Sequence, residues 1–266
     1  MKVLIFPTRA EAETCMAAEL LRTVSGQPDA VLGLATGGTM DRVYERLVSM
    51  ALAQKTDFSR VRSFNLDEYW GIDADHPASY AHYMRTRLFA PLHMDAQLTC
   101  LPNGKAADPD EEARRYEASI AAAGGIDLQI LGIGRNGHIG FNEPTSSLGS
   151  RTRIKTLTAS TREANRCYFA EDETVPAFAL TMGIGTILEA RYCMLLATGT
   201  GKAQAVAAAV EGPLSAACPA SVLQLHPRAT ILLDPDAAST LQLRDYYELV
   251  HPAGSEAIVP LPLASH

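Results

Sequence analysis

A short loop near the middle of the chain carries three side chains that could do acid-base chemistry together: Asn136, His138 and Glu143. An apolar run of strand length, 126–133, leads into it. Four glycines there would let the backbone approach a ligand closely, namely Gly132, Gly134, Gly137 and Gly140. A titratable imidazole beside an amide and a carboxylate predicts a proton-transfer site at the end of a strand. The alternative, an ordinary packed or surface histidine, does not explain the surrounding glycines.

The glycines from Gly132 to Gly137 also spell Gly-x-Gly-x-x-Gly, the fingerprint of dinucleotide-binding folds. That fingerprint belongs in the first strand-to-helix unit and needs an acidic residue about 20 positions further on. Here it lies in mid-chain, and basic residues occupy the region of the acid, namely Arg151, Arg153 and Lys155. The pattern therefore excludes a nicotinamide site.

Two glycine-containing turns could bind an anion. Thr36-Gly37-Gly38-Thr39 lies between a predicted strand and a predicted helix, where backbone amides and the helix N-terminus offer donors to a phosphate. Lys202 opens another predicted helix, and its ammonium suits a single phosphate. Its turn is not a nucleotide-binding P-loop, because the first glycine is absent and Ala203 replaces the usual Ser or Thr. A plain tight turn and a solvated lysine are the alternatives.

A pair of carboxylates, Asp67 and Glu68, follows another predicted strand among Phe64, Tyr69 and Trp70. In an extended segment the two side chains point to opposite sides, so we expect only one to face a crevice. Apolar neighbours raise the proton affinity of a carboxylate toward the range of a general base. A helix cap or a surface pair is the alternative interpretation.

An α/β fold is required to bring these residues together. Short apolar runs alternate with stretches of helical periodicity, which predicts an open, mostly parallel doubly wound (Rossmann-like) sheet with helices on both faces. The predicted strands are 2–6, 30–34, 61–65, 126–133, 192–197 and 230–233, and the predicted helices are 8–25, 40–54, 110–122 and 202–211. Ligands of such sheets bind at the carboxyl ends of the strands. Segments 71–102 and 159–176 break the pattern, and the second predicts a mobile lid.

Length and composition narrow the class of protein. The 266 residues, 47% of them hydrophobic, favour one compact domain over 1–266. A net charge of −7 does not favour binding to nucleic acid or to an anionic membrane. No apolar stretch has the length of a signal-peptide core or a membrane span, which predicts a cytoplasmic protein. Five scattered cysteines without a Cys-x-x-Cys pair predict free, mostly buried thiols and no thiolate metal site.

The chain resembles the glucosamine-6-phosphate deaminase family over nearly its whole length. The resemblance is carried by segments 32–39, 64–71, 131–144, 150–157, 181–188 and 223–227. Its most specific motifs are Gly-Arg-Asn-Gly-His-Ile-Gly-Phe-Asn-Glu-Pro and Asn-Leu-Asp-Glu-Tyr. The resemblance implies conversion of glucosamine 6-phosphate and water to fructose 6-phosphate and ammonia in N-acetylglucosamine catabolism. It implies neither a metal nor an organic cofactor.

The resemblance also implies residue roles. His138 would open the sugar ring, with Asn136 and Glu143 orienting it, and Asp67 would move the C2 proton toward C1. The turn 36–39 and Lys202 would hold the 6-phosphate. Cys167 stands where the lid of the family usually presents an arginine, so Arg166 is the candidate replacement.

A second phosphate site is implied by the regulated, hexameric members of the family, in which matching positions bind N-acetylglucosamine 6-phosphate. Those positions are Ser146, Arg153, Lys155, Thr156 and Tyr246. Independently, Arg153 and Lys155 at alternate positions of an extended segment face one way and can clamp a phosphate. The resemblance thus implies a homo-oligomer, and a hexamer if the site regulates activity. A solvated basic strand is the alternative.

Three other functions stay open: a galactosamine-6-phosphate deaminase, a 6-phosphogluconolactonase, and a sugar-phosphate sensor without turnover. Asp67 together with His138 and Glu143 favours deamination, because lactone hydrolysis needs no base for carbon-acid chemistry.

Overall fold

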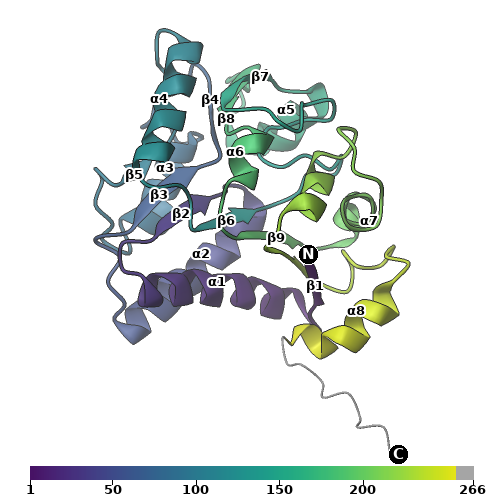
Figure 1. Ribbon diagram of the computed structural model, residues 1–266. Coiled ribbons are helices and arrows are strands. Elements are labelled where there is room, and N and C mark those ends of the chain that lie inside the picture. Colours follow the sequence, from purple (N-terminus) through teal and green to yellow (C-terminus); the bar gives the residue numbers. More distant parts are fainter. Residues whose placement is uncertain (256–266) are drawn as a thin grey trace, which may run out of the picture.

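The computed structural model of the chain describes residues 1–255, and its centre is a seven-stranded sheet (Figure 1). All neighbouring strands are parallel. Their order is β1 (Lys2–Ile5), β10 (Ala229–Leu233), β9 (Cys193–Ala197), β6 (Leu128–Leu131), β2 (Val31–Leu34), β3 (Arg62–Asn65) and β5 (Thr99–Cys100). The inner strands β2, β6, β9 and β10 are buried along their whole length. This is the open parallel sheet that the alternating pattern predicted.

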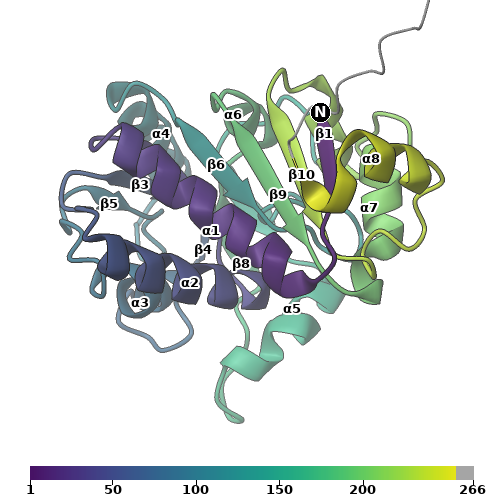
Figure 2. The same ribbon diagram turned by 90° about the horizontal axis from the view of Figure 1, so that it is seen from below.

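Helices cover both faces of this sheet. α1 (Arg9–Gly26) and α2 (Gly38–Gln54) lie side by side on one face, and α4 (Pro109–Ala122) and α6 (Ile184–Leu188) lie on the other (Figures 1 and 2). Thr8 and Glu11 form a capping box that fixes the start of α1. α7 (Ala203–Val210) follows β9 by way of the 3₁₀ turn η3 (Thr200–Lys202), so the predicted helix 202–211 is confirmed over 203–210, and Lys202 belongs to the turn before it.

A second, three-stranded sheet was not predicted. It is antiparallel, with β8 (Phe178–Thr181) between β4 (Asp67–Tyr69) and β7 (Arg153–Thr156). Its strands are three or four residues long, and two of them, β4 and β7, include charged side chains, so neither length nor periodicity marks the sheet in the sequence. The sheet matters for the site because β4 carries Asp67 and because the predicted lid connects β7 to β8.

The predicted lid and the other irregular segment both contain short helices. The lid holds α5 (Ala159–Asn165) and the 3₁₀ turn η2 (Arg166–Tyr168). Segment 71–102 holds α3 (Tyr80–Met84), the π-helical turn η1 (Arg85–Phe89) and β5. The remaining elements follow α7: η4 (Pro219–Leu225), α8 (Arg244–Val250) and η5 (Pro252–Gly254).

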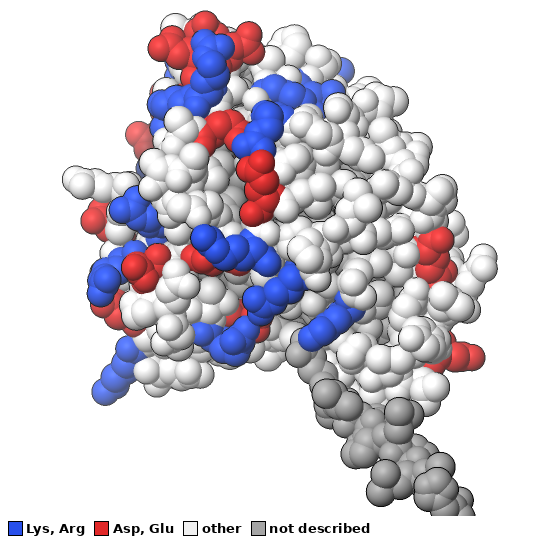
Figure 3. Space-filling model, viewed as in Figure 1, with Lys and Arg blue, Asp and Glu red and all other residues white. Residues whose placement is uncertain are grey.

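The prediction of free thiols is confirmed, but the prediction that most of them are buried is wrong. All five cysteines are free, but only Cys193 and Cys218 are buried, and Cys167 on the lid is exposed. On the face seen in Figure 3, positive and negative side chains are interspersed over the half that carries α4, and the other half is largely uncharged. Within residues 1–255 no helix is long and apolar enough to cross a membrane.

Candidate functional site

A cavity of about 330 Å³ opens at the carboxyl ends of β2, β6 and β9, the edge at which open α/β sheets bind ligands. Most of the candidate residues line it: Thr36, Gly37, Gly38, Thr39, Asp67, Asn136, His138 and Lys202. The lid adds Ser160, Thr161, Ala164 and Asn165. Glu143 lies behind His138, and Arg166 lies outside the lining. The fold thus collects into one cavity residues that are more than 160 positions apart in the sequence.

The turn 36–39 places the N-terminus of α2 on the wall of the cavity. α2 begins at Gly38, two residues earlier than predicted, and its N-cap residue is a glycine, which has no side chain to accept from the first amides. The N-cap residue Gly37 has φ +102°, a conformation that favours glycine. The positive end of a 17-residue helix dipole, behind a glycine N-cap, makes this wall suited to an anion.

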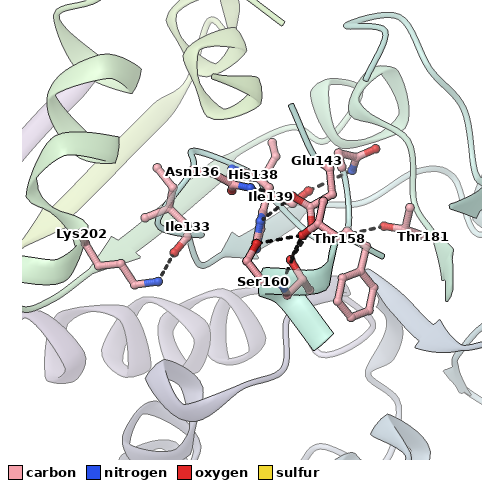
Figure 4. Close-up of polar contacts among 12 residues, drawn as sticks. Ile133, Asn136, His138, Ile139, Glu143, Thr158, Ser160, Thr181 and Lys202 are labelled. Carbon is pink, nitrogen blue, oxygen red and sulfur yellow. Dashed lines mark hydrogen bonds and ion pairs between the residues drawn. The ribbon is translucent and has the colours of Figure 1, made fainter. Parts of the chain in front are cut away.

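Lys202 adds a positive charge to the same cavity. It lies where η3 meets α7, and its ammonium Nζ donates to the carbonyl oxygen of Ile133 at 2.6 Å (Figure 4). Burial lowers the pKa of Lys202, and the nearby guanidinium of Arg135 lowers it further. The side chain is therefore held against the end of β6 and is not a freely solvated surface lysine.

Asp67 is a buried carboxyl group on the cavity wall. Its residue is 5% exposed, at the start of β4. Burial raises the pKa of Asp67 to about 8, and the negative charge of Glu68 adds to this, while the amide of Phe141 donates to Asp67 and partly offsets it. Such a group can exchange a proton with a ligand near neutral pH.

Glu68 points away from the cavity, as the opposite-sides geometry of an extended segment predicts. It accepts hydrogen bonds from the amides of Tyr69, Tyr80 and Ala81 at 2.9, 3.0 and 2.9 Å. Burial nevertheless raises the pKa of Glu68 to about 7. The carboxylate thus holds the start of α3 and is not available to a ligand.

Asn136, His138 and Glu143 form one polar cluster (Figure 4). The Asn136 amide Nδ2 donates to Glu143 Oε2 at 2.7 Å, and the backbone amide of His138 donates to Asn136 Oδ1 at 3.2 Å. The imidazole Nδ1 lies 3.4 Å from Glu143 Oε2, an ion-pair distance. Burial raises the pKa of Glu143, but contacts with His138, Thr161 and Asn136 lower it to about 2. An ionised Glu143 thus faces Nδ1, which leaves Nε2 for a ligand.

The imidazole of His138 packs directly on the backbone of Gly134. A methyl group at Gly134 would lie 2.3 Å from Cε1 and 2.4 Å from both ring nitrogens. The motif therefore needs glycine at position 134 so that the histidine can lie against its own loop.

The same carboxylate that faces His138 also holds the lid. The hydroxyl of Thr158, the N-cap of α5, donates to Glu143 Oε1 at 3.3 Å, and the hydroxyl of Thr161 donates to the same oxygen. At the other end of the lid, the Gly38 amide donates to the hydroxyl of Tyr168. Burial raises the pKa of Tyr168, and this hydrogen bond lowers it by a smaller amount. The lid thus reaches both the acid-base cluster and the turn 36–39.

Arg166 does not point into the cavity. Its guanidinium donates to three carbonyl oxygens of the lid's own loop, those of Phe169, Ala170 and Glu171, at 3.3, 2.6 and 2.5 Å. α5 directs other side chains inward, and the following turn η2 directs Arg166 to these carbonyls. Cys167 is exposed, so neither position of the lid brings an arginine to the cavity.

Two residues that the sequence analysis did not single out contribute to the site. Arg135 lines the cavity beside Lys202. In the sequence it occupies a variable position of the glycine motif, which gives no signal of a role. Asp234, at the end of β10, accepts from the amide of Gly199 with both carboxylate oxygens at 3.0 Å and so fixes the turn before Lys202. In the described part of the chain, no three His, Cys, Asp or Glu side chains gather as metal ligands.

The candidate second phosphate site is only partly assembled in one chain. Arg153 and Lys155 lie at alternate positions of β7, beside the exposed Thr156. Arg153 donates to Asn142 Oδ1 at 2.8 Å, while its Nη2 and the hydroxyl of Ser146 are buried without a partner. Burial lowers the pKa of Arg153. Tyr246 lies on α8, at the opposite end of the molecule from β7 (Figure 1).

Comparisons with known proteins agree with this geometry. A family model described as glucosamine-6-phosphate isomerases/6-phosphogluconolactonase matches residues 8–232. The glucosamine-6-phosphate deaminase of Hahella chejuensis is 52% identical over 250 residues, which cover 94% of this chain and 95% of that protein. The glucosamine-6-phosphate deaminase of Cellvibrio japonicus is 51% identical over 248 residues, 93% of this chain and 94% of that protein.

Solved structures of similar proteins show the same architecture. A monomeric glucosamine-6-phosphate deaminase superposes with a TM-score of 0.87 at 45% identity, covering 90% of this chain and 99% of its own. A 6-phosphogluconolactonase from Trypanosoma brucei superposes with a TM-score of 0.72 at 21% identity, covering 90% and 98%. The second likeness is one of fold alone.

Proposed function

The chain belongs to the family of glucosamine-6-phosphate isomerases and 6-phosphogluconolactonases, and from its site we propose that it is a glucosamine-6-phosphate deaminase. It converts glucosamine 6-phosphate and water to fructose 6-phosphate and ammonia. The observation that carries this choice within the family is Asp67, a buried carboxyl group with a raised pKa on the same cavity as His138. A lactonase would have no use for such a base, because hydrolysis of a lactone breaks no carbon–hydrogen bond.

The substrate enters with its phosphate toward the first turn of α2. The amides at the start of this helix and the ammonium of Lys202 stabilise the phosphate dianion. The sugar ring then extends toward Asp67 and His138 on the rest of the cavity wall. Binding energy from the phosphate orients the reacting carbons, which do not contact the phosphate site themselves.

His138 opens the ring. Its Nε2 accepts the proton of the anomeric hydroxyl and delivers a proton to the ring oxygen, which breaks the bond between C1 and that oxygen. The ionised Glu143 stabilises the imidazolium that forms in between, and Asn136 keeps this carboxylate in place. Because Glu143 also accepts from Thr158 and Thr161, closure of the lid and orientation of the histidine depend on one carboxylate.

Asp67 then moves a proton from C2 to C1. Removal of the C2 proton gives an enolamine, and its return to C1 gives an iminium at C2. Water adds to that carbon and ammonia leaves, so that the C2 carbonyl of fructose 6-phosphate forms. Asp67 must be ionised to take the proton, and the substrate's ammonium group next to it favours the ionised carboxylate despite its burial.

An ammonia-release assay across related sugar phosphates tests this function. We expect the purified protein to release ammonia from glucosamine 6-phosphate and to form fructose 6-phosphate in equal amount. Release of ammonia from galactosamine 6-phosphate but not from glucosamine 6-phosphate would identify a galactosamine-6-phosphate deaminase. Hydrolysis of 6-phosphogluconolactone without ammonia from either amino sugar would identify a lactonase, and binding without any turnover would identify a sensor.

A second candidate function, allosteric activation by N-acetylglucosamine 6-phosphate, is favoured by Arg153. This arginine is partly buried, has no acidic partner among residues 1–255, and lies two positions from Lys155 on β7, and the hydroxyl of Ser146 is also buried without a partner. A phosphate would neutralise and satisfy these groups. Tyr246 can join them only from another subunit, so the activated form is a homo-oligomer, with a hexamer favoured. Light scattering and rate measurements with and without N-acetylglucosamine 6-phosphate test this: a monomer whose rate does not change would exclude it.

A further inference from the structure

Two cations lie next to each other at the mouth of the cavity. Arg135 belongs to the loop after β6 and Lys202 to the turn after β9, and these strands are neighbours in the sheet. The guanidinium of Arg135 lies against the second turn: a methyl group at Gly201 would be 3.6 Å from its Nε and 3.7 Å from its Nη2. Both side chains line the cavity.

Neither cation is neutralised by the protein. Lys202 donates to a backbone carbonyl, and Arg135 forms no hydrogen bond or ion pair with any residue of 1–255. The contrast with the other arginines is clear, since nine of them form an ion pair with a carboxylate: Arg9, Arg22, Arg42, Arg46, Arg85, Arg115, Arg151, Arg191 and Arg244. Two unpaired like charges repel each other unless an anion joins them.

The N-terminus of α2 lies on the same cavity as Arg135 and Lys202. Its N-cap Gly37 offers no side chain, the Gly38 amide contacts only the hydroxyl of the lid's Tyr168, and Thr36 to Thr39 line the same cavity as the two cations. A phosphate dianion placed there meets backbone donors, an ammonium and a guanidinium. The guanidinium can bind two phosphate oxygens at once, which an ammonium cannot.

The lid offers no competing arginine, because Arg166 is bound to the carbonyls of Phe169, Ala170 and Glu171. We propose that Arg135, from the glycine-rich loop, is the arginine that binds the 6-phosphate of the substrate together with Lys202 and the turn 36–39. The proposal rests on the proposed function for the identity of the ligand. It moves the phosphate-binding arginine from the lid to the loop that also carries His138, so that phosphate binding and placement of the imidazole involve one segment.

Binding of fructose 6-phosphate to Arg135→Gln, measured by titration calorimetry, tests this directly. We expect the dissociation constant to rise roughly 10- to 100-fold, the loss of one charged hydrogen-bonding group, and the Michaelis constant for glucosamine 6-phosphate to rise in parallel. Arg135 is exposed and unpaired, so the variant should fold normally. Arg166→Gln is the matched control, with the same charge change on the lid, and should stay within about threefold of the wild type.

Arg135→Lys keeps the positive charge but removes the guanidinium, which can donate two parallel hydrogen bonds. It should recover only part of the affinity, because a lysine cannot bind the phosphate through two parallel hydrogen bonds. Wild-type affinity in Arg135→Gln, or a larger loss in Arg166→Gln than in Arg135→Gln, would overturn the proposal. These binding results do not depend on turnover: a chain that released no ammonia but lost affinity in Arg135→Gln would contradict the deaminase function and leave the phosphate contact standing.

Discussion

Replacing Asp67 with asparagine should make the protein more stable at neutral pH while it removes activity. The residue is 5% exposed, and burial raises the pKa of Asp67 from 3.8 to about 8. The unfolded chain releases this proton at a lower pH than the folded chain does. Stability from this group is therefore fully present below pH 3.8 and is lost as the pH rises through about 8.

The size of the effect follows from the shift. Between these two pH values each pH unit costs the folded state about 1.4 kcal/mol, which amounts to about 4 kcal/mol at pH 7. Asparagine does not ionise and keeps an oxygen to accept from the Phe141 amide. Its new N–H group must find an acceptor, which costs roughly 1–3 kcal/mol. We expect a net gain of about 2 kcal/mol at pH 7, or roughly 4–8 °C in Tm.

Thermal unfolding of the wild type and Asp67→Asn between pH 5 and pH 8.5 measures this gain. The difference in Tm should grow with pH up to about 8, because only the wild type carries the ionising group. Asp29→Asn, at an exposed position, is the control and should give no pH-dependent difference. A difference that stays constant from pH 5 to pH 8, or a variant less stable than the wild type at pH 8, would refute the assignment of a raised pKa to Asp67.

Two further predictions concern the acid-base cluster and the lid. His138→Gln should lower kcat by roughly 10²–10⁴, the usual contribution of a general acid-base group, and leave the affinity for an open-chain analogue reduced at C1 within about threefold. A large loss of affinity for that analogue would mean a structural histidine. Thr161→Val removes the hydroxyl that donates to Glu143 and should speed tryptic cleavage of the lid roughly tenfold, whereas Thr240→Val, which loses an unpartnered hydroxyl, should not. Equal cleavage rates in both variants would show that the hydrogen bond between Thr161 and Glu143 does not hold the lid in place.

The parallel sheet could be predicted because its strands and helices have the periodicities that packing on two faces demands. The mostly apolar segment 126–133 contains β6, and Thr8 with Glu11 marks a helix start. The three-stranded sheet could not be predicted, since β7 reads Arg-Ile-Lys-Thr and pairs with a strand more than 20 residues away. Its existence depends on tertiary contacts and not on local pattern.

The site was predictable where its side chains lie in the segment that follows a strand of the parallel sheet, as Asp67 does after β3 and His138 after β6. Glu68 shows the limit, because its role depends on the amides of Tyr80 and Ala81 in a segment without readable periodicity. Arg166 shows another limit: spacing places it on the lid, but the direction of its side chain is set by the carbonyls of a loop three to five residues further on.

Isotope transfer at the substrate's C2 tests the central claim, that Asp67 is the base of an aldose-ketose isomerising deaminase. Glucosamine 6-phosphate labelled with deuterium at C2 is incubated with the wild type and with Asp67→Asn, and the label at C1 of the product and in the solvent is measured. The wild type should release ammonia and move deuterium from C2 to C1 or to water, and Asp67→Asn should do neither while still binding fructose 6-phosphate. Loss of the C2 label at the wild-type rate in Asp67→Asn would contradict the account.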